Sequence, residues 1–294
     1  MRKIFYILMN ICFASILMCC SNPNKYFSLP LQRPEPGEFS IFLCFGQSNM
    51  EGCSIAEQCD YENIPDNFLT MITANCDVKH YGQERYTWRK ATPPLARYYA
   101  GLSPASQFGK KLIQKFPDNS SIGIVMVAIG ATPIEVFDKD KYKEYCNRED
   151  IEDCVKEWLL EYDNNPYEVL ISAAKEAQKK GVIRGILLHQ GENNCLDSTW
   201  PKSVKKIYNN IINDLNLNPR ETPLLAGELL RTEYGGICGE HNRIIAKLPD
   251  VLPNSYIISS YGLTGKDVFH FSSSGYRLLG ERYANTLLEL YGLY

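Results

Sequence analysis

A serine lies where a predicted strand gives way to a predicted helix. Residues 39–52 read FSIFLCFGQSNMEG, an apolar run that ends abruptly in a polar turn holding Ser48. Hydrolases built on open α/β sheets keep a nucleophile in such a turn, because the strand end exposes the hydroxyl at the edge of the sheet. A single serine in a glycine-flanked turn is more often a turn residue or a helix cap. A catalytic role for Ser48 can therefore be predicted only if the chain also supplies groups that would activate the hydroxyl.

Three further polar clusters follow apolar runs. Gly130 comes after IGIVMVAI, the sequence HQGE at 189–192 comes after RGILL, and Asp267 and His270 come shortly after YIIS. Taken alone, each cluster has a simpler interpretation as a loop, a capping residue or a surface ion pair. Their shared position favours a site, because ligands bind outside the carboxyl ends of the strands in such sheets.

An imidazole and a carboxylate could activate the serine. Among four histidines, His270 lies three residues after Asp267, which on one helical turn brings both side chains to the same side. The carboxylate would hold the Nδ1 hydrogen and leave Nε2 free to accept the proton of Ser48. His80 and His241 do not follow a predicted strand, and we expect them to be structural or solvent-exposed.

Attack on an ester also needs hydrogen-bond donors for the oxyanion that forms. The backbone N–H of Ser48 is one candidate. The backbone N–H of Gly130 is a second, because the missing side chain lets a substrate approach. The side-chain amide of Gln190 is a third.

The elements that would position these groups follow from alternating apolar runs and helix-like segments, which favour βαβ units. Strands are expected at 39–45, 122–129, 183–189, 223–228 and 256–259, and helices at 103–116, 167–181 and from 272 onward. The predicted fold is a three-layer α/β/α sandwich with a mostly parallel five-stranded sheet. Residues 53–102 and 135–165 lack a clear period, and we expect both to be substrate-facing insertions.

The N-terminal residues are typical of an export signal. Arg2 and Lys3 precede an apolar stretch that is too short for a comfortable membrane span, so residues 1–20 are predicted to be a signal peptide. The stretch ends in LMCCSN, which is similar to a bacterial lipobox. Cys20 is the expected lipid anchor and Cys19 the alternative. Secretion without a lipid anchor also stays open. Residues 21–38 are predicted to be a tether and 39–294 the enzyme domain. The expected location is secreted, or membrane-anchored at the bacterial periplasm or surface.

The composition of the chain limits which classes of binding partner are expected. The chain has 294 residues, 45% of them apolar, and a formal charge of only −3, so nucleic-acid binding has no electrostatic support. Eight cysteines follow the predicted signal, and after export they could pair in 105 ways. No Cys or His spacing is typical of a zinc site, so no metal is expected.

Four ordered motifs resemble those of the SGNH hydrolases, specifically the sialate O-acetylesterase and acetylxylan esterase group called carbohydrate esterase family six. GQSNMEG at 46–52 is similar to its nucleophile block, AIGATPIE at 128–135 to its glycine block, HQGEN at 189–193 to its HQGE block, and DVFHFSSSGYRLLGERYA at 267–284 to its terminal block. The resemblance spans roughly residues 39 to 290 and implies a flavodoxin-like fold and no cofactor.

The resemblance also implies roles for residues. Ser48 would be the nucleophile and His270 the base, and the backbones of Ser48 and Gly130 would form the oxyanion hole with Gln190 or Asn49 contributing. Gln47, His189 and Glu192 are expected to bind substrate.

The third catalytic residue stays open at this point. Members of the group have been described with either the final-block aspartate or the HQGE glutamate in that role. Asp267 is favoured by its spacing to His270, and Glu192 is the alternative orienter. This chain also has Leu188 before its HQGE block and Asn193 and Asn194 after it, where members often have Trp and an SD pair.

The expected function is hydrolysis of O-acetyl groups on carbohydrate through an acetyl-serine intermediate. An inactive carbohydrate-binding descendant of the fold is the alternative from another class, and an esterase for other short acyl groups is a further one. A thioesterase or lipase ranks last, because residues 53–102 suggest no broad apolar groove. The sequence does not say which acetylated sugar is the substrate or whether the chain forms oligomers.

Overall fold

The computed structural model describes residues 30–293. The predicted signal peptide and both candidate anchors, Cys20 and Cys19, lie outside the described residues and stay predictions. Within residues 30–293, none of the helices combines the length and apolar character needed to cross a bilayer.

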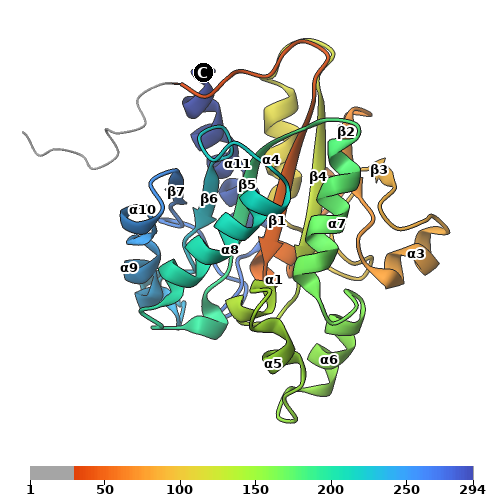
Figure 1. The fold of residues 1–294 in the computed structure, drawn as a ribbon. Helices are drawn as coiled ribbons and strands as arrows, with labels where there is room; N and C mark the ends of the chain where they lie inside the picture. The colour runs from red at the N-terminus through yellow and green to blue at the C-terminus, as the bar shows by residue number, and fades with distance from the viewer. Residues whose placement is uncertain (1–29, 294) are drawn as a thin grey trace, which may run out of the picture.

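One sheet runs through the described part of the chain (Figure 1). Its seven strands are β1 Phe39–Gly46, β2 Phe68–Met71, β3 Trp88–Lys90, β4 Ser121–Ala128, β5 Val182–His189, β6 Leu224–Gly227 and β7 Ser255–Ile258. Their order across the sheet is β3-β2-β4-β1-β5-β6-β7. Only the β2–β3 pair is antiparallel.

Helices cover both faces of this sheet. The α-helices are α1 Ser48–Glu51, α2 Gln58–Tyr61, α3 Asn75–Tyr81, α4 Pro104–Ile113, α5 Tyr142–Cys146, α6 Asp153–Leu160, α7 Pro166–Gln178, α8 Trp200–Asp214, α9 Asn242–Ile245, α10 Leu248–Val251 and α11 Ser273–Tyr291. The 3₁₀ segments are η2 Ile134–Phe137, η3 Glu192–Asn194, η4 Thr232–Tyr234 and η5 Gly239–His241.

The apolar runs of the central strands are buried on both faces, as parallel strands between two helical layers should be. In β1, Ile41, Leu43 and Phe45 pack in the core beneath α7 and α8. The alternate residues Phe42 and Cys44 pack beneath α4 and α11. The predicted three-layer α/β/α sandwich is therefore confirmed.

All five predicted strands and all three predicted helices are present, but the strand count is wrong. β2 and β3 lie at one edge of the sheet, inside the segment 53–102 that was predicted to be an irregular insertion. They have four and three residues, too few for a period-two pattern to stand out in the sequence. Helix α8 was also not expected, although its buried residues recur at helical spacing.

The predicted tether is partly folded. Leu31 is buried, and its backbone N–H donates to the carbonyl of Leu290 at 3.0 Å. The Arg33 side chain donates to the carbonyls of Tyr291 and Gly292, each at 2.8 Å. Residues 30–38 therefore pack against the domain, and a free tether cannot extend to residue 38.

The topology reverses direction at β1. From β1 the chain moves to β2, β3 and β4 on one side, and then returns to β5 on the other side. Such a switch point leaves a crevice at the carboxyl ends of the strands. Ser48 follows β1 directly, at the start of the short helix α1.

Two glycines let the chain turn this sharply. Gly46 has φ +147°, and a Cβ there would lie 2.1 Å from the carbonyl oxygen of His189 on β5. Gly52, just after α1, has φ +108°, and a Cβ there would lie 2.6 Å from the carbonyl oxygen of Gly101. The turn is thus fixed by close backbone approach on both sides.

Candidate active site

The structure brings together Ser48, His270 and Asp267. The His270 ring, in the loop between β7 and α11, has its Nε2 2.9 Å from the Ser48 Oγ. The other ring nitrogen, Nδ1, lies 2.8 Å from Oδ2 and 3.0 Å from Oδ1 of Asp267. A hydroxyl, an imidazole and a carboxylate thus form one hydrogen-bonded chain, as the sequence predicts.

Asp267 is held in place by more than the imidazole. Its Oδ1 accepts hydrogen bonds from the backbone N–H groups of Phe269 and His270, both at 2.8 Å. Partial burial acts to raise the pKa of the Asp267 carboxyl, but the hydrogen bonds from His270 and from these amides outweigh it and lower the pKa below its usual value. The carboxyl is therefore ionised at neutral pH and can hold the hydrogen on Nδ1.

Glu192 has a different partner. Its Oε1 accepts a hydrogen bond from the Asn49 side chain at 2.5 Å, and its buried Oε2 has no partner among the described residues. Burial raises the pKa of this carboxyl to about 7, against the opposing effects of its own backbone N–H and of Asn49. The hydrogen bonds thus join Asp267, not Glu192, to the His270 ring, although Glu192 lines the same pocket.

Two of the predicted oxyanion donors do not face the pocket. The Gln190 side chain is 1% exposed, and its Nε2 donates to Oε1 of Gln47 at 3.0 Å and to Oδ1 of Asn194 at 2.7 Å. The Nδ2 of Asn49 donates to Glu192 and to the carbonyl of Phe269. Both amides are committed to protein acceptors, so the predicted direct contribution of Gln190 or Asn49 is wrong for this arrangement.

Gly130 is placed as expected, but its amide is engaged. A Cβ at this position would lie 3.3 Å from the Trp158 ring and 3.6 Å from the Cβ of Ser48, so the missing side chain leaves room beside the hydroxyl. The Gly130 N–H, however, donates to Oε2 of Glu51 at 3.0 Å. Ser48, as the first residue of α1, has a backbone N–H without an intrahelical acceptor.

Of the predicted substrate-binding residues, His189 is misplaced. It is fully buried, its Nε2 lies 3.0 Å from the carbonyl oxygen of Glu228, and burial lowers its pKa to about 4. It is absent from the pocket lining, so the prediction that it binds substrate is wrong. Gln47 and Glu192 do line the pocket.

The remaining histidines lie away from the chemistry, as expected. His80 is exposed and stacks on Tyr98. His241 is fully buried, and its Nδ1 accepts the backbone N–H of Leu196 at 3.1 Å.

A cavity of about 550 Å³ opens beside Ser48. The segments predicted to be substrate-facing insertions supply much of its wall, which confirms that expectation in part. The insertion-derived lining residues are Cys53, Arg97, Tyr99, Ala100, Gly101 and Trp158. No residue spacing in these insertions marks these six as site residues, so the sequence indicates only the segments in which they lie.

A buried ion pair forms the floor of this cavity. The Nε of Arg97 lies 2.6 Å from Oε1 of Glu51, and both side chains are almost fully buried, with exposures of 2% and 6%. The guanidinium lies over the rings of Tyr99 and Trp158, 5.0 and 4.9 Å from their centroids. Because Glu51 also accepts from Gly130, one carboxyl joins α1, the end of β4 and the first insertion.

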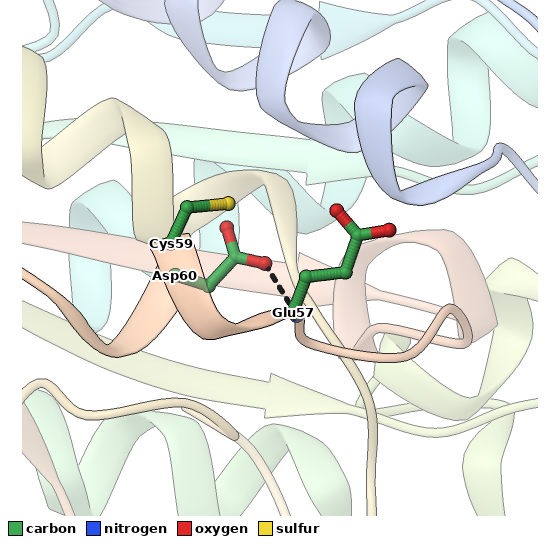
Figure 2. A group of neighbouring side chains, drawn as sticks. All are labelled: Glu57, Cys59 and Asp60. Carbon is green, nitrogen blue, oxygen red and sulfur yellow. Dashed lines mark hydrogen bonds between the residues drawn. The ribbon is translucent and has the colours of Figure 1, made fainter.

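A second acidic group lies outside this cavity. Glu57, Cys59 and Asp60 have potential ligand atoms within 4.8 Å of one another (Figure 2). The Arg277 guanidinium bonds to both carboxyls, at 2.5 Å to Glu57 and 2.8 Å to Asp60. The Arg277 cation therefore already neutralises part of the negative charge that a metal ion would need.

The Arg97–Glu51 pair gives a stability prediction. Arg97→Met is expected to lower the free energy of unfolding by about 3 kcal/mol, because it leaves a buried carboxylate without a counter-charge. Adding Glu51→Gln should restore more than about 1 kcal/mol, since the amide oxygen still accepts from Gly130 and the charge is gone. Urea unfolding measures both.

The matched control is Arg148→Met, which removes an exposed partner of Asp150 and should leave the urea-unfolding curve close to that of wild type, because solvent screens the pair. Equal losses in Arg97→Met and in the double variant would contradict the assigned role of the buried charge.

Glu192 gives a pH prediction. A carboxyl whose pKa rises from 4.5 in the unfolded chain to about 7 in the folded one binds more protons when folded, so stability decreases as pH rises through that window. We expect wild type to lose up to about 3 kcal/mol relative to Glu192→Gln between pH 5 and pH 8. Urea unfolding at several pH values tests this, and parallel curves for the two proteins would rule it out.

Known proteins resemble this chain in sequence and in fold. Residues 38–289 match the family described as carbohydrate esterase, sialic acid-specific acetylesterase. Among solved structures, the fold is similar to a protein from Arabidopsis thaliana, with 20% identity, TM-score 0.63 and coverage of 86% of this chain and 98% of that one. It is also similar to NanS, with 16% identity, TM-score 0.64 and coverage of 88% and 99%.

A third similar structure is XAC1771, described as a carbohydrate acetylesterase from Xanthomonas citri, with 18% identity and TM-score 0.57. The match covers 86% of this chain and 56% of that one. At these identities the solved structures show a shared fold, while the family match covers most of the sequence. The chain belongs to the carbohydrate esterase family of sialic acid-specific acetylesterases and is a carbohydrate O-acetylesterase.

Proposed function

We propose that the chain removes acetyl groups from carbohydrate by a serine mechanism of the SGNH type, with an acetyl-serine intermediate. The observation that carries the proposal is the hydrogen-bonded chain from Ser48 through His270 to Asp267 at the wall of the cavity. This order gives a hydroxyl nucleophile, a base and a group that fixes the tautomer of the base.

The first half of the reaction uses all three side chains. The Ser48 oxygen attacks the acetyl carbonyl carbon while Nε2 of His270 takes the hydroxyl proton. Asp267 stabilises the imidazolium without becoming protonated. The tetrahedral intermediate then expels the sugar oxygen, which takes the proton from His270. Acetyl-serine remains.

The second half uses water. His270 takes a proton from a water molecule as its oxygen attacks the acetyl-serine carbonyl. The serine oxygen leaves with that proton, and acetate is released. No cofactor enters either half, and the atoms balance as ester plus water giving alcohol plus acetate.

For the oxyanion, the Ser48 backbone N–H is the first donor. Two side-chain amides at the cavity wall complement it. Among the described residues, Gln47 Nε2 donates one hydrogen bond, to Asn193 Oδ1, and Asn193 Nδ2 donates one, to the carbonyl of Ala131. Each amide therefore keeps one hydrogen for a substrate oxygen.

The cavity suits a short acyl group with a sugar attached. Gly52, Gly101, Gly130 and Ala100 contribute no bulk beside Ser48, while Tyr99, Trp158 and Phe269 offer ring surface. The cavity volume of about 550 Å³ is typical of a small-molecule site. An acetylated sugar is the proposed substrate, in preference to a long-chain ester.

An inactive carbohydrate-binding protein is the weaker alternative. Such a protein would need the ring surface but not a base aligned on a hydroxyl. The Nε2–Oγ distance of 2.9 Å favours the enzyme.

The first prediction concerns the nucleophile and the base. Ser48→Ala and His270→Ala should each lower kcat for acetate release by at least about 10³-fold, because neither half-reaction proceeds without them. Acetate release from p-nitrophenyl acetate and from an O-acetylated sialoside measures this. His80→Ala, which alters an exposed histidine, should retain wild-type rates. Wild-type rates in both active-site variants would refute the serine mechanism.

The second prediction separates Asp267 from Glu192. Asp267→Asn should lower kcat by about 10⁴-fold, since the amide no longer selects the tautomer that accepts the serine proton. Glu192→Gln should cost less than about tenfold, because it bonds to Asn49 and not to the ring. Steady-state kinetics of the two isosteric variants compare them directly. A large loss confined to Glu192→Gln would reverse the assignment.

A further inference from the structure

Two segments beside the cavity lie against each other. The first, residues 192–196, follows β5 and includes η3, and the second, residues 238–241, includes η5. The Cys238 thiol donates to the carbonyl of Glu192 with an S–O distance of 3.7 Å. The backbone N–H of Leu196 donates to Nδ1 of His241 at 3.1 Å. These two contacts bring the segment that contains Cys195 against the segment that begins with Cys238.

The two thiols influence each other. Cys195 is exposed and Cys238 is 8% exposed, and both are free in the structure. Burial raises the pKa of the Cys238 thiol to about 12, and the neighbouring Cys195 thiol adds to the rise. Neighbouring thiols can form a disulfide where the backbone lets the two sulfur atoms approach to about 2.0 Å.

The other described cysteines lack such a neighbour. Burial alone raises the pKa of Cys44, which lies inside β1. Cys53 and Cys76 are influenced, besides burial, chiefly by carboxylates. The Cys146 thiol bonds to the carbonyl of Asn164 at 3.4 Å. Cys195 and Cys238 are therefore the pair that the described contacts favour.

We propose that Cys195 and Cys238 form a disulfide that joins the wall of the active-site cavity to the segment supporting the His270 loop. On one side of the link, Glu192 and Asn193 line the cavity. On the other side, the N–H of Ile237 donates to the carbonyl of Val268 at 3.1 Å, one residue after Asp267. The bond would tie together two parts of the site that otherwise meet through hydrogen bonds.

The bond forms by thiol–disulfide exchange with a small disulfide such as oxidised glutathione. The exposed Cys195 attacks it, forming a mixed disulfide and releasing one thiol. Cys238 then loses its proton and attacks the Cys195 sulfur, which releases the second thiol. The two protein protons leave on the two released thiols, the small disulfide is reduced, and the two cysteines are oxidised. The second step should accelerate with pH, because the attacking group is the thiolate.

The test uses the full-length chain, reduced and then equilibrated with oxidised glutathione. Peptide mapping under non-reducing conditions should find the Cys195–Cys238 link. The oxidised protein should show a Tm about 4 to 10 °C above that of the reduced protein, because the bond restricts the unfolded chain between the two residues. Cys195→Ser should abolish both effects. Cys154→Ser, which alters an exposed cysteine on α6, should retain both.

Several outcomes would overturn the proposal. The proposal is wrong if Cys195 stays free, stops at the glutathione adduct, or links to a different cysteine. A linked protein with the Tm of the reduced form would also contradict it, since the bond would then restrain nothing. None of these readouts depends on catalysis, so the outcome is independent of the proposed serine mechanism.

Discussion

The buried side chain of Asn49 joins the turn that carries Ser48 to the loop that carries His270. Its Nδ2 donates to the carbonyl of Phe269 at 3.0 Å, and its Oδ1 accepts from the Tyr276 hydroxyl at 2.7 Å. Its Oδ1 also accepts the backbone N–H of Phe271 at 3.4 Å, so Asn49 bonds to the residues on both sides of His270. The same asparagine directly follows Ser48, whose Oγ lies 2.9 Å from the His270 ring although the two residues are 222 apart in sequence. Asn49 acts by position, and its amide hydrogens are not available to a substrate.

Most charged side chains around the cavity are paired with a side chain of opposite charge or with a hydrogen-bond partner. Arg97 compensates Glu51, and His270 lies against Asp267, so the ionised groups nearest the serine have partners. Glu192 is the exception, because burial raises its carboxyl pKa to about 7 and one oxygen has no partner among the described residues. A group that titrates near neutral pH and lines the same pocket as Ser48 couples the local charge of the pocket to pH, although it does not bond to the His270 ring.

The sequence patterns that correctly predicted structure are those that depend on residues close together in the chain. The long strands, such as Phe39–Gly46 and Val182–His189, are apolar because both of their faces are buried. A continuous run of apolar residues in the sequence is therefore enough to predict them. The pairing of Asp267 with His270 also depends on neighbouring residues, so their spacing predicted it. The short strands β2 and β3 were not predicted from the sequence. They form because β2 pairs with β4 and with β3, and neither strand is long enough to show a recognisable hydrophobic pattern.

Sequence alone indicated the α/β architecture, the family resemblance and the grouping of Ser48, His270 and Asp267. Each of these depends on local patterns or on motifs in a fixed order. The tertiary structure decided which polar groups are left over for a substrate. Gln190, Asn49 and His189 lie in the motifs that carry the family resemblance, but their hydrogen bonds go to other groups of the protein. Arg97 and Trp158 lie in segments without a motif, and folding carries them to the cavity wall. The physical reason is that a hydrogen bond is satisfied by whichever partner the folded chain brings within about 3 Å, and sequence spacing does not reveal that partner for residues far apart.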